Sequence, residues 1–511
     1  MFVKLLMLFI FFAVTVTIGL VCRRHTVDVN GFVLGGRSVG PWLSAFAYGT
    51  SYFSAVIFIG YAGQFGWKYG IASTWIGLGN AFIGSLLAWV VLGRRTRIMT
   101  QHLASATMPD FFGKRFQSPS LKIGASVIVF IFLIPYTASL YNGLSRLFGM
   151  AFRIDYTVCI VMMAVLTGVY VIAGGYMATA VNDFFQGIVM LVGIVAVIAA
   201  VLHSNGGFSE ALLRLSAVED PSVSVQKGVF ASFFGPDPLS LLGVVILTSM
   251  GTWGLPQMVQ KFYAIKSEAA VQKGTGISTL FAVVVAGGCY FLGGFGRLFS
   301  IDVAQSGYDS IVPAMLSGLS PLLIGLVVIL VLSASMSTLS SLVIASSSTL
   351  AIDFLKDNFL KNMDQKKQVF TIRILIAVFI LISVFIAVIQ HTSSVTFIAQ
   401  LMGISWGALA GAFLAPFLYG LYWKGTTRAA VWVSFLTGTG LMVCNLLLRG
   451  FFPKPLQSPI NCGAAAMLLG LVVVPLVSSF TGKPDRMFLN QAFACYEAKA
   501  EVPRRVALGR E

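Results

Sequence analysis

The sequence is poor in charged residues. Asp, Glu, Lys and Arg make up 10% of its 511 residues, whereas 57% are hydrophobic and the mean hydropathy is +0.88. Soluble proteins carry about a quarter charged residues, so this composition excludes an ordinary soluble domain. Uncharged apolar runs of about 20 residues, each long enough to cross a hydrocarbon core of ~30 Å, recur along the chain. The sequence therefore predicts an all-α integral membrane protein with many spans.

Histidine and paired cysteine are scarce as well. The four histidines lie outside the predicted spans, and the six cysteines form no CxxC pair. A membrane enzyme needs a metal-ligand set, paired acids, or a nucleophile with a histidine partner. A proton-driven carrier needs a titratable group in its pathway, and Asp183, at a predicted helix entrance, is the only acid expected near the membrane interior. No enzyme and no cofactor are predicted; a proton-coupled carrier, and less favourably a channel or sensor, stay as alternatives.

The basic residues indicate the topology. Most of the 34 Lys and Arg residues, Lys261 among them, fall on one side of the membrane if the N-terminus lies outside. This bias follows the positive-inside rule, so the net charge of +16 is interpreted as a topology signal rather than as nucleic-acid binding. A plasma-membrane protein with its C-terminus in the cytoplasm is predicted. Its thirteen expected spans are 2–21, 42–63, 71–92, 123–148, 155–173, 182–202, 239–262, 276–296, 321–352, 371–390, 395–420, 429–448 and 463–480.

Two of these spans contain residues that interrupt helices. "PWLSAFAYGTSYFSAVIFIGYAG" has a Gly-Thr-Ser triplet at 49–51, and "LLGVVILTSMGTWGLPQMVQKF" has Gly251, Gly254 and Pro256. Glycine frees the backbone and proline removes an N–H donor, so both helices are expected to unwind and leave carbonyls unpaired. Irregular backbone at membrane depth is tolerated where it is buried or lines a cavity. Because the interruptions lie five helices apart, they favour a binding site between two repeats over close packing alone.

A third span is rich in hydroxyls. Ten of the seventeen residues in "SASMSTLSSLVIASSST" (333–349) are Ser or Thr. One helical stripe contains Ala334, Ser337, Thr338 and Ser341. Small-residue stripes let helices pack closely, but hydroxyls that face an unwound segment can also bind a hard cation. We therefore predict a sodium site at Ser337 and Thr338, completed by the carbonyls of Thr50 and Phe53.

Four segments carry a family resemblance: "FVLGGRSVGPW" with "FSAVIFIGYAG", "AGGYMATAVNDFFQGIVMLVG", "ASMSTLSSLVIASSSTLAIDFLK" and "GALAGAFLAPFLYGLYWKGTTRAAV". The sequence resembles the sodium:solute symporter family, in particular its proline and pantothenate branch. The resemblance implies sodium-coupled uptake by alternating access and a LeuT-type core of five plus five inverted helices, with one extra span before and two after. The implied division is 1–41, 42–202 (first repeat), 203–238 (outer loop), 239–420 (second repeat), 421–480 and 481–511 (cytoplasmic tail).

The same resemblance implies the roles of site residues. Sodium ligands map to the carbonyls of Thr50, Phe53 and Ala334 and to the hydroxyls of Ser337 and Thr338. Asp183 maps to the inner ion path.

The substrate is left open by the sequence. Proline symporters carry an aspartate where this chain has Tyr52, and a tyrosine where it has Thr252. No buried Arg or Lys is predicted, so a substrate carboxylate is expected to meet helix N-terminal amides and hydroxyls. The expected partners are sodium, the lipid bilayer and a small solute, either an amino acid such as proline or a carboxylate such as pantothenate, with no obligate protein partner. Candidate contacts are Tyr52, Ser54, Gln64, Tyr141, Thr252, Trp253 and Pro256, joined by Tyr136 and Asn142.

Overall fold

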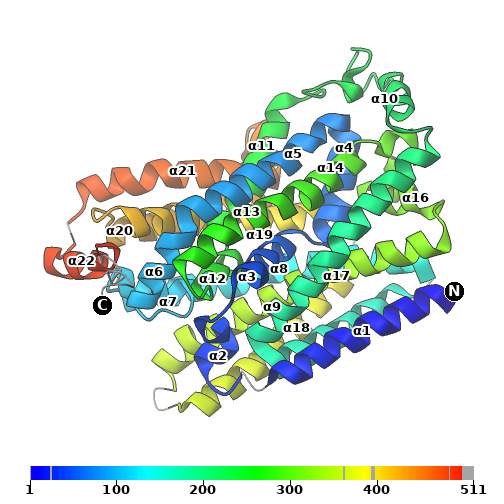
Figure 1. Cartoon of the computed structure of the whole chain (residues 1–511). Helices are drawn as coiled ribbons and strands as arrows, with labels where there is room; N and C mark the ends of the chain where they lie inside the picture. The colour runs from blue at the N-terminus through cyan, green and yellow to red at the C-terminus, as the bar shows by residue number, and fades with distance from the viewer. Residues whose placement is uncertain are drawn as a thin grey trace, which may run out of the picture.

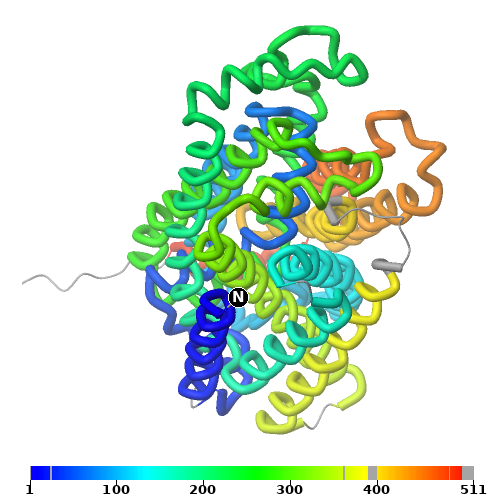
Figure 2. Tube along the Cα trace, turned by 90° about the vertical axis from the view of Figure 1, so that its right-hand side faces the viewer, coloured from blue at the N-terminus to red at the C-terminus, as the bar shows by residue number. Residues whose placement is uncertain are grey.

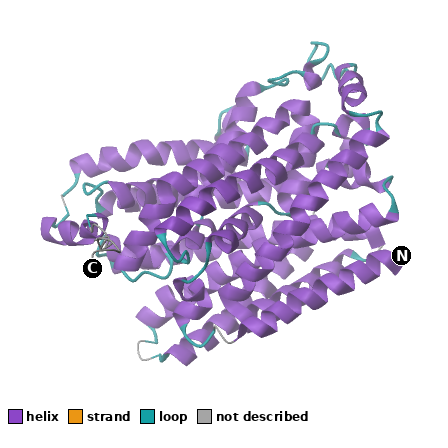
Figure 3. Ribbon diagram, in the orientation of Figure 1, coloured by secondary structure: helices purple, strands orange, loops and turns teal. Residues whose placement is uncertain are grey.

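The computed structural model of the chain describes residues 2–23, 26–152, 154–360, 363–392, 398–482 and 484–497. Figure 3 shows an architecture built of helices and connecting loops. Within the described residues, β pairing is limited to two isolated bridges, Val39 with Ile265 and Asp220 with Ser224. The all-α prediction is confirmed.

The helices follow one another along the chain, and the longest stretch between two of them is 217–237. In chain order they are α1 (Phe2–Cys22), α2 (Val29–Leu34), α3 (Pro41–Tyr52), α4 (Ala62–Tyr69), α5 (Thr74–Gly79), α6 (Arg94–His102), α7 (Met108–Arg115), α8 (Pro119–Phe152), α9 (Tyr156–Ser204), α10 (Phe208–Ser216), α11 (Pro238–Met250), α12 (Pro256–Tyr263), α13 (Glu268–Ala282), α14 (Gly288–Gly293), α15 (Val303–Ser306), α16 (Ile311–Ser317), α17 (Pro321–Thr349), α18 (Gln365–Thr392), α19 (Ile398–Tyr422), α20 (Arg428–Leu447), α21 (Pro459–Phe480) and α22 (Arg486–Phe493). Shorter helical turns that matter below are η3 (Val56–Tyr61), η5 (Asn80–Leu87), η8 (Gly251–Trp253), η11 (Tyr308–Ser310) and η12 (Leu350–Lys356).

The number of spans agrees with the sequence once two long helical runs are divided. Ten helices of the described chain are long and apolar enough to cross a membrane, and a bent pair makes eleven. The runs Val56–His102 and Tyr156–Ser204 would each be ~70 Å long if straight, more than twice a hydrocarbon core. Gly70 and Gly175, with φ of +62° and +56°, divide them. Each run thus covers two of the thirteen predicted segments.

The first interruption lies later in the chain than predicted. Residues 49–51 are helical, and the regular helix ends instead at Tyr52, with Phe53 in extended backbone (φ −94°, ψ 128°). Gly49 serves close packing, because a Cβ there would lie 2.4 Å from Cδ1 of Phe281 on α13. The chain becomes helical again at Ala55 and continues into η3. The break is therefore at Phe53 and Ser54.

The second interruption falls where it was expected. Helix α11 passes through η8 to Leu255, which is extended (φ −82°, ψ 121°), and α12 then starts at Pro256. Proline suits the first helical position because the N–H it lacks would have no partner there. The two parts of this span are bent by 41°.

Helix α17 lies at the centre of the bundle. Its residues from Val327 to Ser348 are all buried, and it packs against α3, α8, α9, α18 and α1. Figures 1 and 2 show α1 at the periphery of this group, while α19, α20 and α21 pack together elsewhere in the bundle. In Figure 1 the start of α1 and the last described helix, α22, lie at opposite ends of the helices.

The regions outside the core contain two further helices. The stretch between α9 and α11 holds α10. Near the end of the described chain, α22 buries Leu489, Ala492 and Phe493. Phe493 lies against the guanidinium of Arg115 on α7, 4.9 Å from ring centre to Cζ. This part of the chain is therefore packed on the bundle; residues 498–511 lie outside the described chain.

Candidate functional site

The hydroxyl of Thr338 lies where the broken end of α3 meets α17. Its Oγ1 is 3.5 Å from the carbonyl oxygen of Thr50, 3.3 Å from that of Ser51 and 3.4 Å from that of Phe53. A fourth carbonyl oxygen, that of Ala334 one turn back on α17, lies at 3.0 Å. Thr338 and Thr50 are both fully buried. Five oxygens thus meet in a buried position between two helices.

Few hydrogen-bond donors reach these oxygens. Because α3 ends at Tyr52, the amides that would continue its ladder point elsewhere: that of Ala55 donates to Oγ of Ser335, at 3.2 Å. Across the described residues, no backbone amide donates to the carbonyls of Thr50, Ser51 or Phe53. A single Thr338 proton cannot satisfy four acceptors. The cluster is therefore rich in acceptors and short of donors.

Two further hydroxyl contacts join α3 to α17. Ser337 donates to Oγ1 of Thr50 at 2.7 Å, and Thr50 donates to the carbonyl of Phe46 at 2.8 Å. One turn further along α17, the hydroxyls of Ser341 and Ser51 are 2.8 Å apart. The predicted stripe on α17 therefore faces α3 as a whole.

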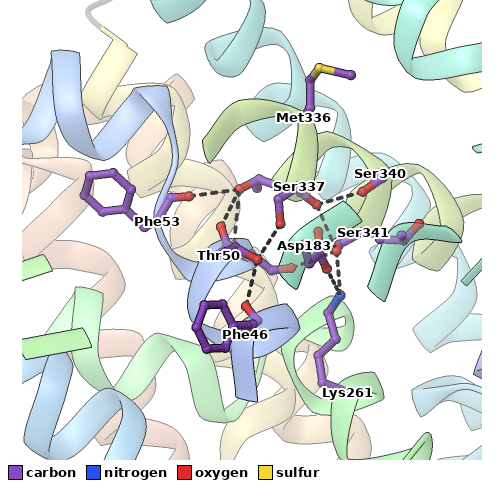
Figure 4. Close-up of polar contacts among 12 residues, drawn as sticks. Phe46, Thr50, Phe53, Asp183, Lys261, Met336, Ser337, Ser340 and Ser341 are labelled. Carbon is purple, nitrogen blue, oxygen red and sulfur yellow. Dashed lines mark hydrogen bonds and ion pairs between the residues drawn. The ribbon is translucent and has the colours of Figure 1, made fainter. Parts of the chain in front are cut away.

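A buried charge pair adjoins this hydroxyl cluster. Nζ of Lys261 lies 2.8 Å from Oγ of Ser341 and 3.5 Å from Oδ2 of Asp183 (Figure 4). The Lys261 and Asp183 side chains are only 2% and 0% exposed. The prediction that no Lys or Arg is buried is therefore wrong. Lys261 was assigned to an inner loop, but the bend before α12 carries it into the bundle.

The position of Asp183 also differs from the prediction. It lies not at a helix entrance but eight residues beyond Gly175, well inside α9. One turn further on, Gly187 allows α9 to approach α3 closely, since a Cβ there would lie 3.0 Å from Cγ2 of Thr50. Oδ1 of Asp183 has no hydrogen-bond partner in the described structure. Asp353, fully buried in η12 directly after α17, shows that Asp183 is not the only acid inside the bundle.

The substrate candidates on the first broken helix divide into two groups. Tyr52 and Ser54 are buried at the break; the Tyr52 hydroxyl donates to the carbonyl of Thr248 at 2.6 Å, and Oγ of Ser54 is unpartnered. Gln64 lies ten residues beyond Ser54 on α4, which packs against η11, away from the break. The structure therefore brings Tyr52 to the second broken helix and buries Ser54 near it at the break, whereas Gln64 lies elsewhere.

The candidates on the second broken helix hold that helix to η5. Thr252 donates to the carbonyl of Gly84 at 3.0 Å, and Nε1 of Trp253 donates to the carbonyl of Ile83 at 3.0 Å. Pro256 is buried at the start of α12. On α8, Tyr136, Tyr141 and Asn142 are buried. The assignment of these residues to a substrate stays a prediction.

Two residues at the centre were missed in the sequence. Trp406 on α19 stacks on Tyr52, with ring centres 6.1 Å apart, and stands edge-on to Tyr136 at 5.9 Å. Nothing in the local sequence of α19 distinguishes this tryptophan from a packing residue. Lys261 could have been identified from the sequence, because an ionisable residue within a predicted span is a functional candidate by default.

Comparison with known proteins agrees with this architecture. The sequence model of the sodium:solute symporter family matches residues 32–438. A sodium/proline symporter from Staphylococcus aureus is 28% identical over 450 residues, covering 86% of this chain and 84% of that protein; the corresponding protein of strain JH9 is also 28% identical, over 451 residues, covering 86% of this chain and 85% of its own.

A solved structure shares the fold. The substrate-bound, outward-open Na+-coupled sialic acid symporter superposes with a TM-score of 0.73 at 15% identity, covering 95% of this chain and 99% of the other. This likeness confirms the LeuT-type arrangement of a multi-pass membrane protein. The relatives are symporters and not enzymes. The family model covers most of the chain, and this protein therefore belongs to the sodium:solute symporter family.

Proposed function

We propose that this protein imports a small organic solute, either an amino acid such as proline or a carboxylate such as pantothenate, together with sodium. The site is the junction of α3 and α17, and uptake occurs by alternating access across the plasma membrane, with the N-terminus outside and the C-terminus in the cytoplasm. The observation that carries the proposal is the set of carbonyls at the α3 break that lack amide partners and surround the Thr338 hydroxyl.

Sodium suits this set of oxygens. The ion would be held by the carbonyls of Thr50, Phe53 and Ala334 and by the hydroxyls of Ser337 and Thr338. Carbonyl and hydroxyl dipoles are sufficient for a single positive charge, and a bound cation supplies what the acceptors lack. All five residues are buried, so the ion would interact with them without competition from bulk water.

Coupling to protons is the second candidate, and one observation favours it. Asp183 and Lys261 form a titratable pair inside the bundle, next to the hydroxyl cluster. The geometry favours sodium because none of the oxygens around Thr338 belongs to a titratable group, and because Asp183 already has a counter-charge in Lys261. In this proposal Asp183 belongs to the inner ion path and Lys261 holds its position.

Transport requires the helices to separate. The space beside the α3 break, lined by Gly49, Tyr52, Phe53 and Asn80 among others, has a cavity volume of only about 10 Å³. Pockets for small organic ligands are usually ~300 Å³ or larger. A solute can therefore enter or leave only when the broken helices move relative to the scaffold, as alternating access requires.

The test is uptake into proteoliposomes of purified protein. Labelled proline, pantothenate and propionate are offered under an inward sodium gradient, and again in sodium-free potassium buffer with an imposed pH gradient. Saturable accumulation that needs the sodium gradient supports the proposal. Accumulation driven by the pH gradient without sodium would show a proton-coupled carrier instead. Downhill flux without accumulation would indicate a channel.

A further inference from the structure

Trp406 is the point at which four core elements meet. Its indole, 1% exposed, stacks on Tyr52 at the end of α3 and stands edge-on to Tyr136 of α8. It also covers the second broken helix, because a Cβ at Gly251 would lie 2.8 Å from Cε3 of Trp406. We call Tyr52, Ser54, Tyr136, Gly251 and Trp406 the Trp406 cluster. Both broken helices contribute to it.

Three polar atoms of the Trp406 cluster have no partner. Oγ of Ser54, the hydroxyl of Tyr136 and Nε1 of Trp406 are buried without a hydrogen bond in the described structure. The Tyr136 hydroxyl faces Ser54 and Trp406, yet no hydrogen bond of good geometry joins it to either. No partner outside the Trp406 cluster satisfies any of the three, so they can bond to a ligand that enters between the helices. The indole N–H can only donate, and both hydroxyls can donate as well.

The Trp406 cluster contains no carboxylate that could pair with a positively charged group. Its five residues are uncharged, and no ion pair or cation–π contact among the described residues includes them. One face of the indole is covered by the ring of Tyr52, which leaves less of it to attract an ammonium. Lys261, which could otherwise pair with a substrate anion, is engaged by Asp183 and Ser341.

We infer that the Trp406 cluster binds the carboxylate of a monoanionic solute that has no ammonium group, with Trp406, Tyr136 and Ser54 donating to its oxygens. This inference rests on the proposed function, because the sodium ion supplies the counter-charge. Ser54 follows Phe53, whose carbonyl is a proposed sodium ligand. A monoanion and one sodium ion make a neutral pair in the buried site, whereas a zwitterion would leave its ammonium unpaired there.

The test compares proline with cyclopentanecarboxylate, which replaces the ring ammonium of proline with a methylene and keeps the carboxylate. Sodium-driven uptake of each labelled compound is measured in proteoliposomes, with unlabelled propionate and pyrrolidine as competitors. Cyclopentanecarboxylate is expected to be taken up with an apparent affinity about tenfold or more above that of proline, propionate is expected to compete, and pyrrolidine is not. Stronger uptake of proline, or competition by pyrrolidine, overturns the inference while sodium symport stands. If a sodium gradient drives accumulation of none of these solutes or of pantothenate, the proposed function itself fails.

A substitution tests the role of the indole N–H. Trp406→Phe keeps an aromatic ring on Tyr52 but removes the donor, and Trp432→Phe on α20, which packs against Gly124 and Phe435, is the matched control. Trp406→Phe is expected to raise the half-saturating cyclopentanecarboxylate concentration about tenfold and to leave the half-saturating sodium concentration, measured at saturating cyclopentanecarboxylate, unchanged. The control is expected to change neither. Equal carboxylate affinity in wild type and Trp406→Phe would show that Trp406 only packs, and would overturn the assignment.

Discussion

Replacing Thr338 with valine tests the sodium site with the least change of shape. Valine keeps the branched side chain and removes the Oγ1 that lies 3.0–3.5 Å from four carbonyl oxygens. Two effects compete. The sodium-bound form loses a ligand of a charged species, worth about 1.5–3 kcal/mol, whereas the sodium-free form loses one neutral hydrogen bond, worth about 0.5–1.5 kcal/mol.

The difference decides the direction. Weakening of the sodium-bound form exceeds that of the sodium-free form by about 1–1.5 kcal/mol, so Thr338→Val is expected to raise the half-saturating sodium concentration roughly five- to tenfold. Thr338→Ser keeps the hydroxyl and is expected to stay near wild type. Ser348→Ala is the control, because Ser348 is buried on the same helix and bonds only to the carbonyl of Ala345, at 3.3 Å.

The assay is initial uptake as a function of sodium at fixed solute, with the sodium-induced rise in melting temperature as a transport-independent readout. Both should weaken in Thr338→Val and in neither of the other two variants. A Thr338→Val protein that matches Ser348→Ala in both measurements would refute the assignment of the ion to this junction.

Three other results are expected. Lys261→Met leaves the Asp183 carboxylate buried without its counter-charge, so the free energy of unfolding should fall by about 3–5 kcal/mol. Adding Asp183→Asn should recover much of this lost stability in thermal unfolding, and a double variant no more stable than Lys261→Met would contradict the pairing. Gly251→Ala places a Cβ 2.8 Å from Cε3 of Trp406, so the ring must shift, and sodium-driven uptake should drop about tenfold at unchanged expression; full uptake would show that the ring is free to move. Burial raises the pKa of Asp110, but two lysine ammonium groups outweigh it and hold that pKa below its usual range. Its stabilisation is therefore present above about pH 4 and lost as pH falls through the lowered pKa, so Asp110→Asn should flatten the acid side of a melting-temperature profile; an identical acid side in both proteins would contradict this.

The meeting of the hydroxyl stripe with the first broken helix could be predicted because both depend on local pattern. Helical periodicity puts Ser337, Thr338 and Ser341 on one face, and that face contacts α3. Pro256 marks the second break for the same reason, since the geometry of proline is set by its own ring.

The exact place of the first break could not be predicted, because tertiary packing overrides the local preference there. Gly49 looks like the weak point of its helix, but α3 stays helical through it so that Phe281 can approach. The helix ends three residues later, at Tyr52, where the hydroxyl of Thr338 meets the freed carbonyls. A single sequence does not show at which of several possible positions the packing of neighbouring helices will interrupt a helix.

The error about Lys261 has a different origin. An apolar run followed by a lysine is typical of a span that ends at the membrane surface, and the positive-inside count depends on that interpretation. The bend of 41° between the two parts of the span redirects α12, so its lysine is buried beside α9. The angle of such a bend depends on packing across the bundle, so it could not be predicted from the periodicity of the sequence.

The pair formed by Lys261 and Asp183 is connected to the ion junction through hydroxyls. Lys261 donates to Ser341, Ser341 contacts Ser51, and the carbonyl of Ser51 faces Thr338. Each link in this path crosses between different helices: α12 to α17, α17 to α3, and α3 back to α17. An ion bound at Thr338 and the charge pair at Asp183 therefore act on the same residue, Ser51, at the end of the first broken helix. Two ligands or charges that bias one movable segment are coupled reciprocally, so the position of α12 and the occupancy of the ion junction must influence one another.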